Sequence, residues 1–289
     1  MRVRILAILS TTALFVLAAV PASASRDAHG YLALGDSVAF GYSPLIFGNA
    51  DLFVGYPNTV AATLDLPLVN ASCPGETTAG FVLRTPATDY MCLPYLAAGF
   101  PLHTTYSGSQ LQFALNYLST HPTVSLVTID LGANDVFKLA AVCHGQDTDC
   151  FASGISGVLT SIDANLRLIL GEIRNVAHYH HAIVVLTYYS VSYDPTTATG
   201  TQLLNAPIID AANAYGGIVA SGFDAFKQPA LNAGGSSCAA GLLIVVAPGV
   251  CNVHPSPAGR DLLAGAVVDA IATSCPAESA MGCMERDQG

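Results

Sequence analysis

The stretch 31-YLALGDSVAFGY-42 decides the fold that we expect for this chain. Residues 31–34 form a short apolar run typical of a buried β-strand, and Gly35, Asp36 and Ser37 follow it directly. A serine just beyond the end of a strand is either a capping hydroxyl or a candidate nucleophile. The segments at the ends of the other expected strands decide between these two interpretations.

Strand-like and helix-like segments alternate along the rest of the chain. The segment VSLVTIDLG (124–132) is continuously apolar, as in a parallel strand covered on both faces. The other expected strands are residues 66–72, 182–190 and 217–223, and the expected helices are residues 56–66, 107–121, 154–180, 201–216 and 254–273. This alternation predicts a three-layer α/β/α (flavodoxin-like) fold with a central, mostly parallel five-stranded sheet. We expect Ser256 to cap the last helix, with residues 84–108 and 228–253 as loop insertions braced by cysteines.

The N-terminus has the features of a secretory signal peptide. Two arginines precede an apolar run, which ends at Pro21 and is followed by the small-residue site Ala22-Ser23-Ala24. We expect cleavage after Ala24, so that residues 1–24 are a signal peptide and residues 25–289 form a single domain that is secreted, either extracellular or periplasmic. A retained membrane anchor is the alternative, but the run is short for a bilayer span.

The charge of the mature chain limits its partners. Removal of residues 1–24 leaves 8 basic and 20 acidic residues, and this acidic surface repels nucleic acid and anionic lipid. No later apolar run is long enough for stable membrane insertion. We therefore expect a monomer whose partner is a small-molecule or lipid substrate.

All eight cysteines lie after the expected cleavage site. In an oxidising compartment an even number favours disulfides, and sequential pairs would each close a local loop. We expect the pairs Cys73–Cys92, Cys143–Cys150, Cys238–Cys251 and Cys275–Cys283. Zinc ligation is disfavoured because no closely spaced cysteine pair is followed by histidines at finger-like spacing.

Four residues of interest follow expected strands. Ser37 follows the first, Gly75 the second in NASCPGET, Asn134 the third in DLGAND and His254 the fifth in CNVHPSPAG. The carboxyl ends of parallel strands meet at one edge of the sheet, which is where such folds bind ligands. In this order the segments resemble the four motif blocks of the SGNH, or GDSL, hydrolase superfamily, and the resemblance covers nearly all of the mature chain. NASCPGETTAGF, YSGSQL, VTIDLGAND and LTYYS further resemble its secreted bacterial esterases and lipases.

The resemblance implies a serine hydrolase that cleaves carboxylic esters without a metal or an organic cofactor. Ser37 would attack the ester carbonyl and form an acyl-enzyme, while His254 would act as general base. The oxyanion would be held by the backbone N–H groups of Ser37 and Gly75 and by the side-chain amide of Asn134. A histidine with an ordinary pKa of about 6.5 would lose this activity in mild acid.

The chain departs from the family pattern at one position. Many members carry an aspartate three residues before the histidine, where it orients the imidazole, and Cys251 occupies that position here. We therefore expect a catalytic dyad in which a backbone carbonyl of residues 247–252 holds the imidazole Nδ1–H. The alternative is an aspartate from elsewhere in the chain.

Several functions remain open at the level of the sequence. The leading hypothesis is an esterase or lipase, and the alternatives are an acetyl-xylan type carbohydrate esterase, a phospholipase or a non-catalytic binding protein on the same fold. A flavodoxin-like nucleotide binder is disfavoured, because the first loop lacks a phosphate-cradling glycine pattern. Phe40, Tyr42, Leu45, Ile46 and Phe47 follow Ser37 and are candidates for the wall of an acyl site, or for ordinary core packing.

Overall fold

Five parallel strands form the centre of the molecule. The computed structural model describes residues 29–46 and 49–274. Its strands are β1 (Gly30–Gly35), β2 (Leu68–Asn70), β3 (Val124–Asp130), β4 (Ala182–Leu186) and β5 (Ile218–Ala220). They lie in the order β2-β1-β3-β4-β5, and every pair is parallel. The predicted five-stranded α/β fold is therefore confirmed.

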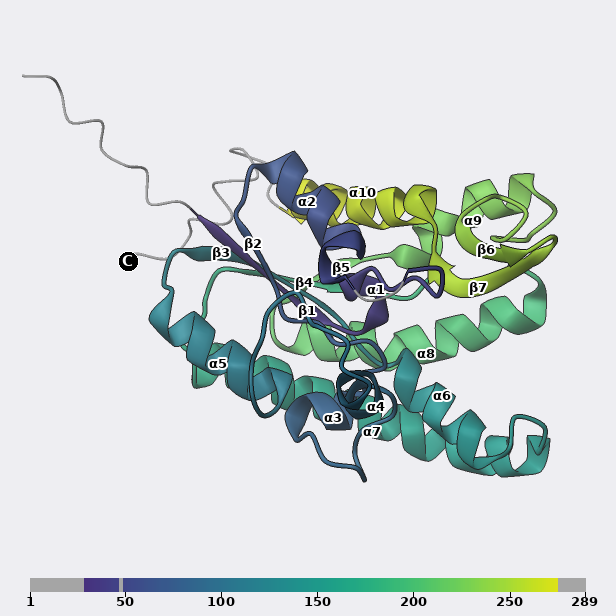
Figure 1. Cartoon of the computed structure of the whole chain (residues 1–289), viewed down its shortest axis with the longest axis horizontal. Helices are drawn as coiled ribbons and strands as arrows, with labels where there is room; N and C mark the ends of the chain where they lie inside the picture. Colours follow the sequence, from purple (N-terminus) through teal and green to yellow (C-terminus); the bar gives the residue numbers. More distant parts are fainter. Residues whose placement is uncertain (1–28, 47–48, 275–289) are drawn as a thin grey trace, which may run out of the picture.

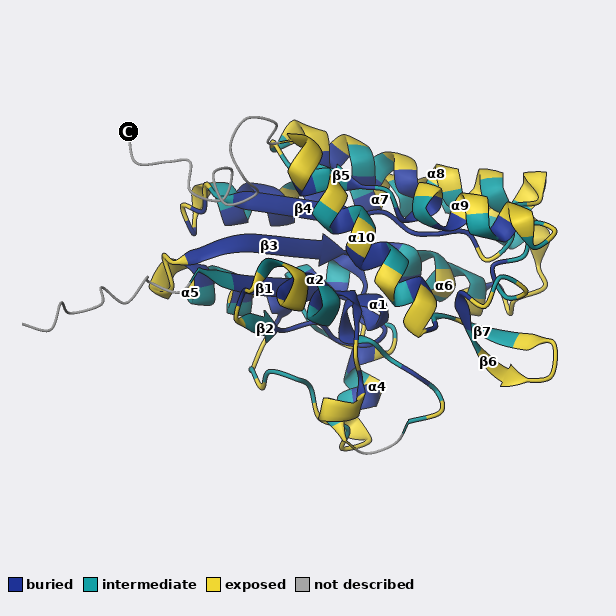
Figure 2. Cartoon of the chain, turned by 90° about the horizontal axis from the view of Figure 1, so that it is seen from above, coloured by how far each residue is buried: buried dark blue, intermediate teal, exposed yellow. Residues whose placement is uncertain are grey.

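Helices cover both faces of this sheet, as Figure 1 shows. On one face lie α2 (Tyr56–Leu64), α9 (Gly222–Asn232) and α10 (Pro257–Ser274), and on the other lie α5 (Gln110–Thr120), α7 (Thr148–Asn175) and α8 (Pro195–Ala214). All seven residues of β3 and all five of β4 are buried, which explains their continuous apolar sequences. Figure 2 shows these buried strands between helices whose outer faces are exposed.

Short elements begin where the first three strands end. The helix α1 (Ser37–Phe40) follows β1, α3 (Thr78–Val82) follows β2, and α6 (Ala133–Val142) follows β3. A 3-10 helix, η1 (Ala50–Leu52), and α4 (Cys92–Ala97) lie in the connections. The strand order reverses between β1 and β3, so these short helices surround the switch point at which open α/β sheets bind ligands.

Two regions expected to be loop insertions contain regular structure. Residues 84–108 include α4, and residues 228–253 include the end of α9 and most of an antiparallel hairpin, β6 (Leu243–Ala247) with β7 (Val250–Pro255). Gly249 makes the tight turn of this hairpin in the left-handed region, at φ 72°. His254 therefore lies on β7, and α9 and β6 separate it from the fifth strand of the sheet. Ser256 caps α10 as expected, because its Oγ accepts from the N–H of Gly259 at 3.2 Å.

Three disulfides join segments around the carboxyl edge of the sheet. They are Cys73–Cys92, Cys143–Cys150 and Cys238–Cys251, three of the four expected pairs. The pair Cys275–Cys283 and the expected signal peptide (1–24) lie outside the described residues. Among the described residues, every helix is too short or too polar to cross a lipid bilayer.

Candidate active site

Ser37 sits at the first position of α1, directly after β1. Asp36 precedes it and caps the helix, because its Oδ1 accepts from the N–H of Val38 at 2.9 Å. Gly35 has φ 138°, and a Cβ there would lie 2.4 Å from Oδ1 of Asp130 at the end of β3. Only glycine lets the chain turn this closely beside β3, and this turn carries Ser37 to the edge of the sheet.

The structure brings Ser37 and His254 together across 217 residues of sequence. The Nε2 atom of His254 lies 2.8 Å from Oγ of Ser37. The other ring nitrogen, Nδ1, contacts the side-chain Oδ1 of Asn252. The prediction that a backbone carbonyl of residues 247–252 holds this nitrogen is therefore wrong in its detail, because a side-chain amide two residues before the histidine does so.

The contacts of Asn252 define the tautomer of the imidazole. The backbone N–H of His254 donates to the same Oδ1 atom at 3.1 Å, which identifies that atom as the acceptor end of the amide. Nδ1 must then carry the ring proton of the neutral imidazole, and Nε2 is the unprotonated nitrogen. The lone pair of Nε2 therefore faces the hydroxyl of Ser37, as proton transfer from this hydroxyl requires.

Burial keeps the imidazole neutral. Desolvation lowers the pKa of His254 from 6.5 to about 4, because the charged form is disfavoured away from water. The ring of Tyr42 packs against the imidazole with centroids 4.9 Å apart. The neutral form, which can accept a proton, therefore persists well below the pKa of an exposed histidine.

Gly75 and Asn134, which follow β2 and β3, lie near Ser37 and His254 at the carboxyl edge of the sheet. Within the described residues, the backbone N–H groups of Ser37 and Gly75 donate to no acceptor, which leaves them available to a ligand. The Asn134 amide nitrogen donates to Oδ2 of Asp36 and to the carbonyl of Glu76, both at 3.0 Å. Both amide hydrogens are engaged, so an oxyanion would share one of them with its present acceptor.

Asp36 connects the nucleophile loop to the neighbouring strands. Besides Asn134, its Oδ2 accepts from the phenol of Tyr188, which follows β4, at 2.6 Å. Burial raises the pKa of Asp36, and the hydrogen bonds from Tyr188 and Val38 oppose that rise. Asp36 thus bonds within its own loop through Val38, and its bonds to Asn134 and Tyr188 connect this loop to the ends of β3 and β4.

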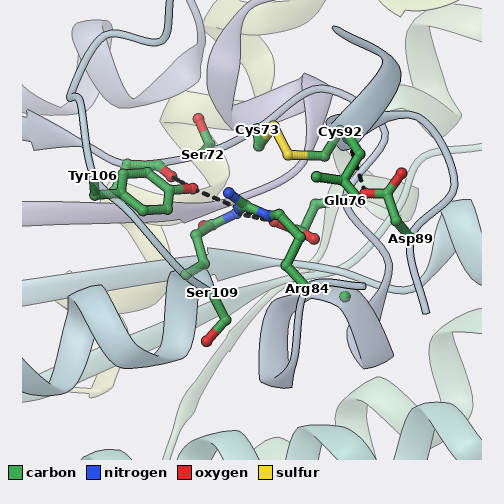
Figure 3. Close-up of polar contacts among 12 residues, drawn as sticks. Ser72, Cys73, Glu76, Arg84, Asp89, Cys92, Tyr106 and Ser109 are labelled. Carbon is green, nitrogen blue, oxygen red and sulfur yellow. Dashed lines mark hydrogen bonds and ion pairs between the residues drawn. A yellow bond between two sulfur atoms is a disulfide. The ribbon is translucent and has the colours of Figure 1, made fainter. Parts of the chain in front are cut away.

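A buried ion pair supports the segment that carries Gly75 (Figure 3). Oε2 of Glu76 accepts from the Arg84 guanidinium at 2.7 Å and from the Gln110 side chain at 3.0 Å. Gln110 in turn bonds both the N–H and the carbonyl of Gly35, at 2.8 and 2.9 Å. This network, which sequence reasoning missed, ties the Gly75 loop to the end of β1. The nearby cluster of Cys73, Glu76 and Cys92 offers no metal site through its thiols, because the two cysteines are joined in a disulfide.

A cavity of about 860 Å³ opens at Ser37, and Gly75, Asn134 and His254 also line it. Its other walls are mostly apolar and come from α4, α6, α7, α8 and β7. Among the described residues, no lysine or arginine lines it. Of the five residues expected to form an acyl wall or to pack in the core, Tyr42 is the one described residue that lines the cavity. Phe40 is buried in a separate cluster, Leu45 is exposed, Ile46 packs beside Phe40, and Phe47 lies outside the described residues.

Comparisons with known proteins agree with this fold. None of the curated proteins is detectably similar to the chain in sequence. Among solved structures, the chain is similar to Axe2, an acetylxylan esterase from Geobacillus stearothermophilus, with 19% identity, a TM-score of 0.51, and coverage of 84% of this chain and 93% of that one. A variant of Axe2, described as an acetyl-xylooligosaccharide esterase, gives 17% identity and a TM-score of 0.52 with the same coverage. At these identities the likeness shows the fold alone.

The family is shown by the sequence itself. The model of the GDSL-like lipase/acylhydrolase family matches residues 33–262, which is most of the chain. The chain belongs to this family, and it is a carboxylic-ester hydrolase.

The buried ion pair yields a prediction for stability. Replacement of Arg84 by methionine should lower the free energy of unfolding by about 3 kcal/mol, because it leaves the Glu76 carboxylate buried without its partner. Chemical denaturation measures this change. The matched control is Arg167→Met, which removes an exposed pair with Asp163 on α7 and should change stability little. Equal effects of the two substitutions would show that the Glu76–Arg84 pair does not support the fold.

Proposed function

We propose that this chain is a secreted serine esterase in which Ser37 is the nucleophile, His254 the general base and Asn252 the residue that orients the base. The observation that carries the proposal is the 2.8 Å contact between Oγ of Ser37 and the unprotonated Nε2 of His254 at the wall of the cavity. Nucleophile, base and orienting group then lie in one hydrogen-bonded line, which is the arrangement that activates a serine hydroxyl.

Acylation begins when Ser37 Oγ attacks the ester carbonyl and its proton moves to Nε2 of His254. The carbonyl oxygen becomes an oxyanion, which the N–H groups of Ser37 and Gly75 stabilise together with the shared hydrogen of Asn134. The imidazolium then returns its proton to the alkoxide, which leaves as the alcohol, and an acyl-serine ester remains. In the second half, His254 takes a proton from water, hydroxide attacks the acyl carbonyl, and Ser37 recovers its proton as the carboxylic acid leaves.

Asn252 differs from an aspartate in one physical respect. Its neutral amide oxygen fixes the orientation and tautomer of the imidazole but adds no negative charge beside it. A carboxylate at this place would stabilise the imidazolium and raise the pKa of His254. The amide therefore does not raise the pKa of His254, which burial has lowered. The imidazole stays neutral in mild acid and can still accept a proton there.

Secretion is supported by the disulfides and by the N-terminal sequence. Three disulfides persist only in an oxidising environment such as the extracellular space or the periplasm. The apolar run and the Ala22-Ser23-Ala24 site give a route there. The mature protein then starts near Ser25 as a single domain.

The carbohydrate-esterase alternative has weaker support. Acetylated polysaccharide requires polar groups that bind sugar hydroxyls, whereas the cavity is mostly apolar. The absence of lysine and arginine from its lining, within the described residues, also disfavours recognition of a phospholipid headgroup.

Removal of the nucleophile tests the mechanism. Ser37→Ala should lower kcat for p-nitrophenyl esters by roughly 10⁴-fold or more, because Ser37 supplies the one hydroxyl that contacts Nε2 of His254 in the part of the chain that the structure describes. The melting temperature should stay close to that of the parent. Ser43→Ala is the matched control, since this serine lies in the same loop but does not line the cavity, and its activity should be normal. Retained activity in Ser37→Ala would rule out the proposed nucleophile.

The pH profile tests the base and its orienting amide. The parent should keep its kcat/KM from about pH 8 down to pH 5.5, since the pKa of His254 is lowered to about 4 and the neutral form is lost only below that range. Asn252→Asp should move the acidic limb upward by one pH unit or more, because the new carboxylate stabilises the imidazolium. Asn252→Ala should lower kcat more than it changes KM, since the imidazole loses its fixed orientation.

The other titratable groups on the cavity wall near the imidazole are Asp36, Tyr42, Tyr188 and Tyr189, and none is altered in these variants. Asn213→Asp, an exposed change on α8, should leave the profile of the parent unchanged. If Asn252→Asp has the same acidic limb as the parent, Asn252 does not contact the base in the working enzyme.

A further inference from the structure

The cavity beyond Ser37 is walled by two sets of elements. On one side lie Met91 and Tyr95 of the α4 region, and on the other lie side chains of α6, α7 and α8. The second side begins next to Asn134, the first polar residue of α6. It therefore starts where the substrate carbonyl would bind.

The helix α7 has two halves with different surroundings. All its buried residues come from Ile162 onward, where the helix packs on the sheet and on its neighbours. In the first half, Phe151, Ile155 and Leu159 line the cavity instead. They are four residues apart and so lie along one face of the helix. Within this apolar stripe, Leu159 also packs against the edge of the core, whereas Phe151 and Ile155 are not among the described side chains that pack against it. The exposure of Phe151 and Ile155 to the cavity calls for an apolar ligand.

The stripe runs away from the reacting centre. A Cβ on Gly132, two residues before Asn134, would lie 3.5 Å from Ile162 and 3.6 Å from Leu204 of α8, so this part of α7 adjoins the oxyanion side. Of the three residues of the stripe, Leu159 is the nearest in sequence to Ile162, and Phe151 lies eight residues before Leu159 in the helix. Eight residues of α-helix span about 12 Å. An extended chain advances roughly 1.2 Å per bond, so this length matches about ten bonds.

The wall is held in a fixed position. The disulfide Cys143–Cys150 joins the end of α6 to the first turn of α7, and Asp147 caps α7 through a bond from the N–H of Cys150 at 2.9 Å. Gly154 of α7 packs closely against α6, since a Cβ there would lie 2.6 Å from Leu139. The apolar stripe is therefore preformed before a ligand arrives.

The part of the cavity wall formed by α8 offers few hydrogen bonds. On α8, Leu203 and Leu204 line the cavity together with two hydroxyls, those of Thr197 and Thr201. The single hydroxyl hydrogen of Thr201 is already shared between the carbonyl of Thr197 and Oγ of Ser190, at 3.0 and 3.1 Å. Sugar hydroxyls placed here would lose water and gain few hydrogen-bond partners, whereas an alkyl chain has no hydrogen bonds to lose.

We propose that the channel between α6–α7 and α8 binds the acyl chain of the substrate, and that the enzyme prefers chains of about ten carbons over acetyl groups. This inference rests on the proposed function, because it assumes an acyl group attached to Ser37. Phe151, Ile155 and Leu159 then set how long a chain the enzyme accepts.

The first test is the chain-length profile of the parent enzyme on p-nitrophenyl esters from acetate to palmitate, with acetylated xylan in parallel. The kcat/KM for octanoate or decanoate should exceed that for acetate by at least tenfold. Hydrolysis of acetate and xylan acetate with no gain from longer chains would overturn the acyl channel and leave the proposed esterase mechanism standing. No hydrolysis of any ester would count against the proposed function itself.

The second test narrows the channel. Ile155→Trp should lower the ratio of kcat/KM for decanoate to that for acetate by tenfold or more, because the indole fills the middle of the stripe. Leu168→Trp is the matched control on the same helix: Leu168 is exposed, does not line the cavity, and should keep the parental ratio. Should Ile155→Trp fail to fold, Phe151→Ala provides the opposite change and should extend the profile toward longer chains. An unchanged profile in the folded variants would refute the placement of the acyl chain.

Discussion

The buried carboxylate of Asp36 is the interaction on which the rest of the site depends. Three strands end at the same edge of the sheet, and each sends one group to this residue or to its loop: Val38 after β1, Asn134 after β3 and Tyr188 after β4. A carboxylate with 1% of its surface exposed is costly to desolvate, and these three donors offset that cost. The position of the Ser37 loop is thereby fixed relative to Asn134 and Tyr188, which also line the cavity.

The three disulfides lie around this hydrogen-bonded network, and each joins segments in a different part of the cavity wall. Cys73–Cys92 joins the Gly75 loop to α4, Cys143–Cys150 joins α6 to α7, and Cys238–Cys251 anchors the hairpin that carries His254. The parallel sheet needs none of them, since its strands are buried between layers of helices. In this chain the covalent links therefore stabilise the substrate cavity, which lies outside the main core, more than the sheet itself.

The sequence was sufficient for the sheet but only in part for the site. Continuous apolar runs such as residues 124–130 identify buried parallel strands, and residues at the ends of such strands must converge. The sequence therefore predicts that Ser37, Gly75 and Asn134 lie together, and all three line the cavity. The β6–β7 hairpin was missed because its valines are largely exposed, which gives no alternation of polar and apolar residues to recognise. The role of Asn252 was missed because its side chain contacts a residue only two positions further along the same strand, and such a contact leaves no pattern in the sequence. The acyl wall was sought near Ser37, whereas α7 supplies it from more than a hundred residues away.

The central claim is that Ser37 is the hydroxyl activated by His254, and covalent trapping tests it most directly. The protein would be incubated with an alkyl p-nitrophenyl phosphonate and then studied by intact-mass measurement and peptide mapping. The account predicts a single phosphonyl adduct, located on the peptide that contains Ser37, and no adduct when His254 is replaced by alanine. An adduct on a different serine, or equal labelling without His254, would contradict it.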